Sequence, residues 1–378
     1  MEKQADVIII GAGVVGGAIA YYLTEKGKSV IILEQDEVAS GASGGNNGQI
    51  SIIDREPGLE LDWTKDSLEL YKGYEENGDF KTDLEITGGL SLFYNEKEIE
   101  IGKKVIEKYN IIGYNCEMLV GKEIKQQEPI LNTDVVMGAA YCKEEGKLNP
   151  FSVTIGFVDK AIEKGAKLFT KNKVLDFSFE DGKIKEVITN KGHFCGDNIV
   201  IATGAWTREL MSKLDLDYKI FYTRASSMVT NPIEPCIKST MVPGCFAIGT
   251  ICEGNWNLLG VTQHKNGTIT IGQDTRSFNN YNKGVSYDGI VGQAKNFNKH
   301  FPTLANLDVV RVWSAITPHV EDSLPLFGYS KKYTNMFLAA GLKGAFTIAP
   351  AAGKMAAEII TCNNTDRRVD EYSPARFE

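Results

Sequence analysis

The sequence predicts an α/β fold in which a buried parallel sheet is joined to a second, β-rich unit. Three observations lead to this prediction. Residues 6–10 form a short apolar run rich in β-branched side chains, which is typical of a buried parallel strand, and three closely spaced glycines follow it. Residues 29–33 repeat the strand pattern after a helix-like segment that ends at a glycine. Later in the chain, β-rich runs at positions 220–230, 257–261 and 268–272 predict further strands.

The composition is that of an ordinary globular protein. The 378 residues suffice for two or three domains with a large core. Hydrophobic residues make up 43% and charged residues 24% of the chain, which excludes disorder and fibrous repeats. The 41 basic and 49 acidic residues give a net charge of −8, which argues against nucleic-acid binding because basic residues must neutralise the phosphates. The 38 glycines suggest close backbone approaches, as around a bulky cofactor.

The sequence offers no sign of a membrane segment or of a metal site. No apolar run approaches the ~20 residues that cross a bilayer, and the short apolar run near the N-terminus follows acidic residues, unlike a signal peptide. The seven cysteines are widely spread and include no CxxC pair, so we expect neither a disulfide framework nor a zinc or iron–sulfur site. We therefore expect a soluble, cytoplasmic protein.

The three glycines after the first strand have the spacing of a dinucleotide-binding turn. Gly11 permits a tight turn, Gly13 lets the backbone approach a pyrophosphate, and Gly16 lets the following helix pack closely on the strand. The helix N-terminus then directs N–H groups and a positive dipole end at the phosphates. Glu34, at the end of the second strand, would accept hydrogen bonds from a ribose diol. Because strand, glycines, helix, strand and acid occur in the required order, we predict a dinucleotide site rather than an ordinary βαβ turn.

A polar, glycine-rich stretch follows this acid at residues 40–49. Its composition alone would also suit a flexible, solvated loop. The residues of this stretch that match the loop of a known family are Ser40, Ser43, Gly44, Asn47, Gly48 and Gln49. On these residues the chain resembles the FAD-dependent D-amino-acid oxidase superfamily, which includes glycine oxidase and sarcosine oxidase. In that family the corresponding loop wraps the pyrophosphate, the ribityl chain and the flavin ring.

The resemblance continues to the C-terminus. Residues 202–206 match the Ala-Thr-Gly turn that brings backbone close to the FAD phosphates, and Val174 matches a strand that contacts adenine. Residues 339–353 match the strand–loop–helix that lies along the flavin, and residues 373–377 match the terminal Ser-Pro-x-Arg-Phe. With the N-terminal motif, these matches give the candidate FAD contacts Gly11, Gly13, Val14, Val15, Gly16, Glu34, Gln35, Ser40, Gly41, Ser43, Gly44, Asn47, Gly48, Gln49, Val174, Ala202, Thr203, Gly204, Trp206, Gly341, Leu342, Lys343, Gly344, Ala345, Phe346 and Thr347.

The resemblance also implies how the chain is divided. We expect a two-dinucleotide-binding (Rossmann-like) FAD domain and an α+β substrate domain built on an antiparallel sheet. The segments expected in the FAD domain are residues 1–84, 146–218 and 317–378, and those expected in the substrate domain are residues 85–145 and 219–316.

The activity that the resemblance implies is oxidation of a C–N bond by hydride transfer to the flavin. Substrates of such enzymes are amino or imino acids and secondary amines, such as proline, hydroxyproline, a D-amino acid, sarcosine or glycine. This chemistry needs no dedicated general base, because the neutral amine assists hydride departure. We therefore interpret each of the four histidines, His193, His264, His300 and His319, as a structural or surface residue.

The chain departs from the family where the substrate carboxylate should bind. Thr317 stands where glycine oxidase-like members carry an arginine, so another cation is needed. The candidates for positioning the substrate are Lys343, Arg311, Arg224 and Tyr222, with Trp256 as a further pocket wall, although each could equally be a structural residue. Residues 314–316 contain no cysteine where sarcosine oxidase-like members tether their flavin, so we expect non-covalent FAD.

Three functions remain open from the sequence. The compact length and the loop at residues 40–49 resemble flavin subunits of proline, hydroxyproline, opine or glycine-oxidising dehydrogenase complexes, which pass electrons to partner subunits. The first hypothesis is therefore a dehydrogenase with a small amino- or imino-acid substrate and electron-accepting partner subunits. The second is an oxygen-using oxidase that produces hydrogen peroxide. The third is a flavin-binding assembly module without redox activity.

Overall fold

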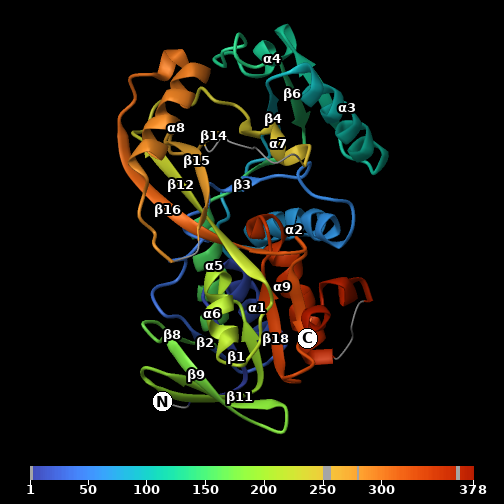
Figure 1. Ribbon diagram of the computed structural model, residues 1–378, viewed down its shortest axis with the longest axis vertical. Coiled ribbons are helices and arrows are strands. Elements are labelled where there is room, and N and C mark those ends of the chain that lie inside the picture. The colour runs from blue at the N-terminus through green and yellow to red at the C-terminus, as the bar shows by residue number, and fades with distance from the viewer. Residues whose placement is uncertain (1–2, 250–256, 279–280, 363–366) are drawn as a thin grey trace.

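The computed structural model describes residues 3–249, 257–278, 281–362 and 367–378. Two large sheets lie one beyond the other along the long axis, with the N-terminal sheet in the lower part of Figure 1 and the second sheet in the upper part. Helix α2 (Leu59–Glu76) lies between them. The observed architecture is the expected combination of a mainly parallel and a mainly antiparallel sheet.

The first sheet has the strand order β17-β18-β11-β1-β2-β8, and β9 and β10 extend it from β11 as a meander. Strands β1, β2, β8, β11 and β18 are parallel, whereas β17 pairs antiparallel with β18. The bounds are β1 Gln4–Ile10, β2 Val30–Leu33, β8 Lys167–Phe169, β9 Val174–Glu180, β10 Lys183–Thr189, β11 Gly192–Ile201, β17 Leu326–Tyr329 and β18 Met336–Ala340.

The alternation of side chains along β1 explains why this sheet is buried on both faces. Val7 and Ile9 pack into a core with helices α1 (Val14–Glu25), α5 (Pro150–Glu163) and α9 (Ala345–Cys362). Ile8 and Ile10 pack on the opposite side, against apolar residues of β9, β10 and α6 (Thr207–Ser212). A strand covered on both faces needs a continuous apolar run, which is the pattern found at residues 6–10.

The second sheet has the order β16-β12-β15-β14-β13-β4-β6-β5 and is antiparallel except for the pair β13–β4. The predicted runs at 220–230, 257–261 and 268–272 lie in β12, β14 and β15. The bounds are β4 Gly89–Phe93, β5 Cys116–Val120, β6 Gly138–Cys142, β12 Ile220–Thr230, β13 Thr240–Pro243, β14 Asn257–Gln263, β15 Ile269–Phe278 and β16 Val309–Val320.

Shorter elements complete the two parts. The helices of the second part are α3 Glu96–Ile111, α4 Lys122–Gln127, α7 Gly244–Ala247 and α8 Tyr287–His300. A small antiparallel pair, β3 (Gln49–Ile50) with β7 (Gly146–Lys147), joins the loop after the glycine-rich stretch to the segment before α5. Each sheet draws on the blocks of sequence expected for one domain, except that β16 runs to Val320, past the predicted boundary at residue 317. The division into domains itself stays a prediction.

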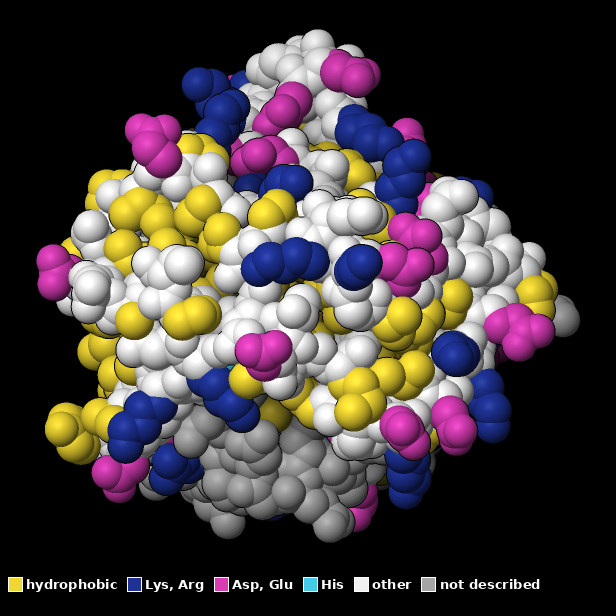
Figure 2. Space-filling model, turned by 90° about the horizontal axis from the view of Figure 1, so that it is seen from above, with side chains coloured by type: hydrophobic (Ala, Val, Ile, Leu, Met, Phe, Trp, Pro, Cys, Tyr) yellow, Lys and Arg dark blue, Asp and Glu magenta, His cyan; other side chains and the backbone are white. Residues whose placement is uncertain are grey.

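The surface carries charges of both signs. On the face shown in Figure 2, lysine and arginine side chains are interspersed with aspartate and glutamate side chains. Such mixing agrees with the mildly acidic net charge and differs from the basic face of a nucleic-acid-binding protein. None of the helices in the described residues is long and apolar enough to span a bilayer.

The thiols depart from the sequence expectation at one position. Cys245 is disulfide-bonded, whereas the sequence favoured a chain without a disulfide framework. Within the part of the chain that the structure describes, the cysteines with free thiols are Cys116, Cys142, Cys195, Cys236 and Cys362. The spacing of cysteines alone could not reveal this bond, because pairing depends on which Cβ atoms the fold brings together.

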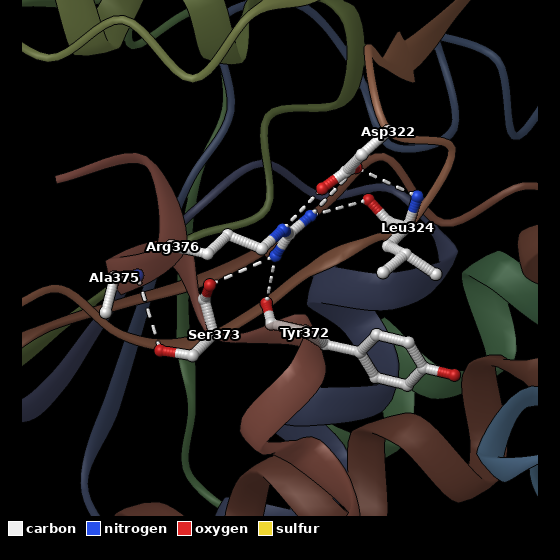
Figure 3. Close-up of polar contacts among 6 residues, drawn as sticks. All are labelled: Asp322, Leu324, Tyr372, Ser373, Ala375 and Arg376. Atoms are coloured by element: carbon white, nitrogen blue, oxygen red, sulfur yellow. Dashed lines mark hydrogen bonds and ion pairs between the residues drawn. The ribbon is translucent and has the colours of Figure 1, made fainter.

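The C-terminal motif is a structural anchor. The Arg376 guanidinium donates hydrogen bonds to both carboxylate oxygens of Asp322, at 2.7 and 3.2 Å, and to the Leu324 carbonyl at 2.9 Å (Figure 3). It also donates to the carbonyls of Tyr372 and Ser373, at 2.7 and 3.0 Å. One side chain therefore ties the end of the chain to the turn between β16 and β17.

Replacing Arg376 with methionine tests this anchor. We expect the free energy of unfolding to fall by about 1–2 kcal/mol at neutral pH, because charge-assisted hydrogen bonds are lost but Asp322 is partly screened by water. Burial opposes ionisation of Asp322, yet the hydrogen bond from Arg376 lowers its pKa below the usual value. The contribution is therefore present above the pKa of a free aspartate and is lost as the pH falls below it. Urea unfolding at neutral and at acid pH measures the difference in free energy of unfolding between the wild type and the variant. The same difference at both pH values would contradict the role of the Arg376–Asp322 ion pair.

Candidate active site

A cavity of about 460 Å³ lies at the carboxyl ends of β1, β2, β11 and β18 and extends to the second sheet. Because parallel strands end at the same edge of a sheet, the loops that follow them meet there, and this edge is the usual ligand site of such folds. The glycine-rich turn, the loop at residues 40–49 and the segment at residues 341–347 all contribute to its wall. Strands β12 and β16 close it from the other side.

The turn after β1 can be formed only by glycine. Gly11 has φ +109°, and a Cβ there would overlap the carbonyl oxygen of Ala202, which follows β11. A Cβ at Gly16 would overlap the carbonyl oxygen of Gly11. The glycines therefore allow the turn, the helix and the end of the neighbouring strand to touch one another.

The N-terminus of α1 lies at the cavity wall, and its cap residue carries no side chain. Gly13 is its N-cap residue and makes no side-chain capping bond. The N–H of Val14 donates to the Ser43 hydroxyl at 3.0 Å, which fixes the loop at residues 40–49 against the helix. Both residues line the cavity, so helix N–H groups and a hydroxyl lie together where a phosphate is stabilised best.

Glu34 is held in place by the backbone. Its carboxylate accepts hydrogen bonds from the N–H groups of Ala12 and Asp36, at 2.9 and 2.8 Å. Burial raises the pKa of Glu34, while these two N–H groups oppose the shift. The carboxylate is thus buried and oriented at the wall, as a ribose-binding acid requires.

Most of the candidate FAD contacts line this one cavity. They are Gly11, Gly13, Val14, Val15, Glu34, Gln35, Ser40, Gly41, Ser43, Asn47, Gln49, Val174, Ala202, Thr203, Gly204, Trp206 and residues 341–347. Gly16, Gly44 and Gly48 lie behind the wall instead, where a Cβ would overlap carbonyl oxygens of neighbouring segments. These three glycines allow close packing, as the sequence predicted for Gly16, and their direct contact with FAD stays a prediction.

Two of the proposed substrate residues point away from the cavity. The residues of β12 that line it are Thr223, Ala225 and Ser227. Tyr222 and Arg224 are the alternate residues of the same strand, so the period of two turns them to the opposite face. Neither residue lines the cavity, and their role in positioning a substrate stays a prediction.

Arg311 is also absent from the cavity wall. On β16 the wall residues are Ala315, Thr317, Pro318 and His319, near the end of the strand. Trp313 donates its indole N–H to the Gly45 carbonyl at 3.0 Å. The residues of β16 that precede Trp313 are exposed, and Arg311 is one of them. Trp256 lies outside the described residues.

Sequence reasoning missed Arg55, which is only 6% exposed and lines the cavity. Its guanidinium donates to Glu60 at 2.9 Å and to the carbonyls of Lys343 and Gly344, both at 2.9 Å. Arg55 thus fixes the loop that carries Lys343. No local signal could reveal this role, because the loop lies 288 positions further along the chain.

The turn that carries Arg55 is fixed by a buried acid. Glu145 accepts hydrogen bonds from the N–H groups of Ile52 and Ile53, at 2.6 and 3.0 Å. Burial raises the pKa of Glu145 to about 7, although these N–H groups oppose the shift. The sequence did not predict this role of Glu145. The residue lies between β6 and β7, more than 90 positions after the turn that it fixes.

His319, interpreted from the sequence as a structural or surface residue, lies at the wall. Its Nε2 shares a hydrogen bond of 2.8 Å with the Thr223 hydroxyl. Burial lowers the pKa of His319, and the charge of Lys343 lowers it further. The imidazole is therefore neutral at neutral pH and contributes polarity without charge.

The wall contains polar atoms that need a ligand. Among the described residues, the buried wall atoms without a hydrogen-bond partner include Asn47 Oδ1, Asp54 Oδ1, Arg55 Nε and Asn172 Oδ1. Because an unpaired buried polar atom costs free energy, such a group of atoms indicates a polar ligand. With the glycine turn, the helix N-terminus and Glu34, the wall fits a dinucleotide.

Comparison with known proteins decides which family this is. Residues 6–359 match the model of the FAD dependent oxidoreductase family (DAO). The chain belongs to this family. FAD is accordingly the cofactor that the wall described above would hold, and the chain is an FAD-dependent oxidoreductase.

Full-length relatives agree with this assignment. The glycine oxidase of Geobacillus kaustophilus is 25% identical over 388 residues, with 100% of this chain and 98% of the relative covered. The crystal structure of L-proline dehydrogenase from P. horikoshii is 29% identical, has a TM-score of 0.89, and is covered over 98% of its length by 100% of this chain. The mitochondrial pyruvate dehydrogenase phosphatase regulatory subunit of Mus musculus is 23% identical over 383 residues, but this chain spans only 44% of its length.

Substitution of Gly11 by alanine tests the FAD site. We expect the purified variant to lose its yellow colour, because the added Cβ overlaps the Ala202 carbonyl and separates the turn from β11. Gly27 is a matched control, since it also has positive φ (+73°) but no atom lies within 4 Å of an added Cβ. Visible absorbance per mole of protein measures bound flavin. Loss of flavin from both variants, or from neither, would refute the role of the close contact.

Proposed function

We propose that this chain is an FAD-dependent dehydrogenase that oxidises the C–N bond of a small amino or imino acid. The observation that carries the proposal is the pair formed by Arg55 and the loop of Lys343 at the cavity wall. Its relatives support the substrate class, because they include glycine oxidases, an L-proline dehydrogenase, a sarcosine oxidase subunit beta and D-amino acid dehydrogenases.

Lys343 is the cation best suited to a substrate carboxylate. The cationic side chains on the wall, among the described residues, are Arg55, Lys173, Lys213 and Lys343. Lys173 lies 3.6 Å from Glu209 and is thus already paired. Lys343 is close enough to Glu60 and His319 to influence the pKa of both. The loop that carries it lies against the end of β16, since a Cβ added at Gly341 would overlap the Val320 side chain.

Arg55 supports Lys343 from behind. Its bonds to Glu60 and to two loop carbonyls leave Nε without a partner among the described residues. The loop is thus held by a buried arginine whose charge is paired with Glu60, which leaves Lys343 as the unmatched positive charge of this proposal. This arrangement replaces the missing arginine at Thr317, whose short side chain lies beside Thr223 on the neighbouring strand.

The remaining wall residues suit the uncharged part of a small substrate. Val242 and Phe246 contribute apolar surface, and Thr223, Thr317 and neutral His319 contribute hydrogen-bonding groups. When bound, FAD supplies the hydride acceptor for such a reaction. The chain's own residues bind the carboxylate, orient the carbon next to nitrogen and exclude water from it.

Two alternatives keep specific support. The glycine oxidases favour an oxygen-using enzyme, and the name of the phosphatase regulatory subunit, which indicates regulation, is compatible with a flavin-binding module without turnover. We prefer the dehydrogenase because L-proline dehydrogenase combines 29% identity with coverage of both whole chains. An electron-accepting partner subunit is part of this proposal, in line with the subunit beta among the relatives. A cytoplasmic location also stays a prediction.

An anaerobic screen tests the proposed function. L-proline, hydroxyproline, sarcosine, glycine and D-amino acids are added separately to the yellow protein without oxygen. We expect at least one to bleach the flavin absorbance, and the same substrate to reduce an artificial dye faster than it produces peroxide in air. Faster peroxide production would identify an oxidase. Absence of bleaching by every compound would overturn the proposal in favour of a binding module.

Replacement of Lys343 by methionine tests the carboxylate site. We expect the KM of the bleaching substrate to rise ~10–100-fold in the flavin-loaded variant, since a charge-assisted contact is lost. Lys213→Met is the matched control, because Lys213 also lines the cavity but lies on the segment after α6. Steady-state kinetics measure both variants. A normal KM for Lys343→Met, or an equal rise for Lys213→Met, would exclude the assignment.

A further inference from the structure

A short segment of the second part of the molecule reaches across to the FAD wall. Residues 281–286 connect β15 to α8. The Lys283 ammonium donates a hydrogen bond to the Ser40 carbonyl at 3.0 Å, although the two residues are 243 positions apart. Ser40 lines the cavity. The connection therefore ties the loop at residues 40–49 to the second sheet.

The same segment lies on a second part of the wall. The Lys283 ammonium is 5.2 Å from the centre of the Trp206 ring. The Tyr281 ring stacks on the Trp206 ring, with 5.8 Å between the two ring centres and 10° between their planes. Trp206 lines the cavity too. A Cβ added to Gly41 would lie 3.6 Å from the Trp206 ring, so the loop and the tryptophan are in contact where the segment meets them.

The segment is fixed to the second sheet at its other side. The Tyr281 hydroxyl shares a hydrogen bond of 3.1 Å with the Tyr222 hydroxyl. The Ser314 hydroxyl donates to the Lys283 carbonyl at 2.6 Å, and Arg224 donates to the Asn282 carbonyl at 3.5 Å. Tyr222 and Arg224, which the strand turns away from the cavity, thus hold this connection.

We propose that residues 281–283 act as a clasp that holds the loop of Ser40 and the Trp206 ring closed on FAD, with Lys283 as its key positioning residue. Lys283 donates a hydrogen bond to the loop of Ser40 and lies over the ring of Trp206, so one side chain fixes the distance between these two parts of the wall. Opening the cavity beside Trp206 requires that both contacts break. The clasp therefore slows the release of FAD, and this role does not depend on which substrate the enzyme takes.

The rate of FAD release tests the clasp. Lys283→Met keeps the alkyl chain but removes the ammonium, and we expect release about 3–10-fold faster, because a hydrogen bond and a cation–π contact are lost. Lys283→Arg retains both kinds of contact and should restore slow release. The rise of free-FAD fluorescence after dilution of the holoprotein measures the rate without any turnover.

Lys3→Met is a closely matched control. Lys3 donates to the Lys191 carbonyl at 2.9 Å and lies 5.3 Å from the centre of the Phe194 ring, but none of these residues lines the cavity. It should release FAD at the wild-type rate. The proposal is overturned if Lys283→Met stays within two-fold of the wild type, or if Lys3→Met accelerates release equally. Either result would leave the proposed amino-acid oxidation untouched, because no substrate is present.

Discussion

The close contact between the turn after β1 and the end of β11 is the constraint on which the rest of the site depends. Gly11 lies so near the Ala202 carbonyl that no side chain fits between them. This contact sets the helix N-terminus at the sheet edge, and Ser43 then fixes the loop at residues 40–49 against it. Every other wall of the cavity is placed relative to these segments. A dinucleotide is accommodated here because backbone, rather than side chains, forms the floor.

The site is completed by side chains that bring distant segments together. Arg55 fixes the loop of Lys343, Glu145 fixes the turn of Arg55, and Lys283 ties the loop of Ser40 to the second sheet. These contacts are polar and largely between a side chain and backbone groups. Because such bonds are directional, they specify loop positions that apolar packing alone would leave loose.

Motif residues could be predicted because their chemistry is local. The glycine spacing, Glu34 and the loop at residues 40–49 lie within fifty residues of the N-terminus and meet at one sheet edge. The cation that binds the substrate was harder to predict from the sequence, since any arginine can equally form a structural ion pair or hydrogen bond. Arg224 and Arg311 do not line the cavity, because the first turns to the other face of β12 and the second lies on the exposed first part of β16. Arg55 was missed because its partners are loop carbonyls, which no sequence pattern marks.

The sequence by itself determined the buried strands, the dinucleotide turn and the family. The strands follow from the period of the hydrophobic residues, and the turn follows from glycines at positions where any side chain would overlap the neighbouring backbone. The tertiary structure alone decided which cations reach the cavity, that His319 lies at its wall and that residues 281–286 cross to the FAD loop. The physical reason is that a side chain's direction follows from strand register and its partners from the packing of the two sheets, and neither is encoded within a short window of the chain.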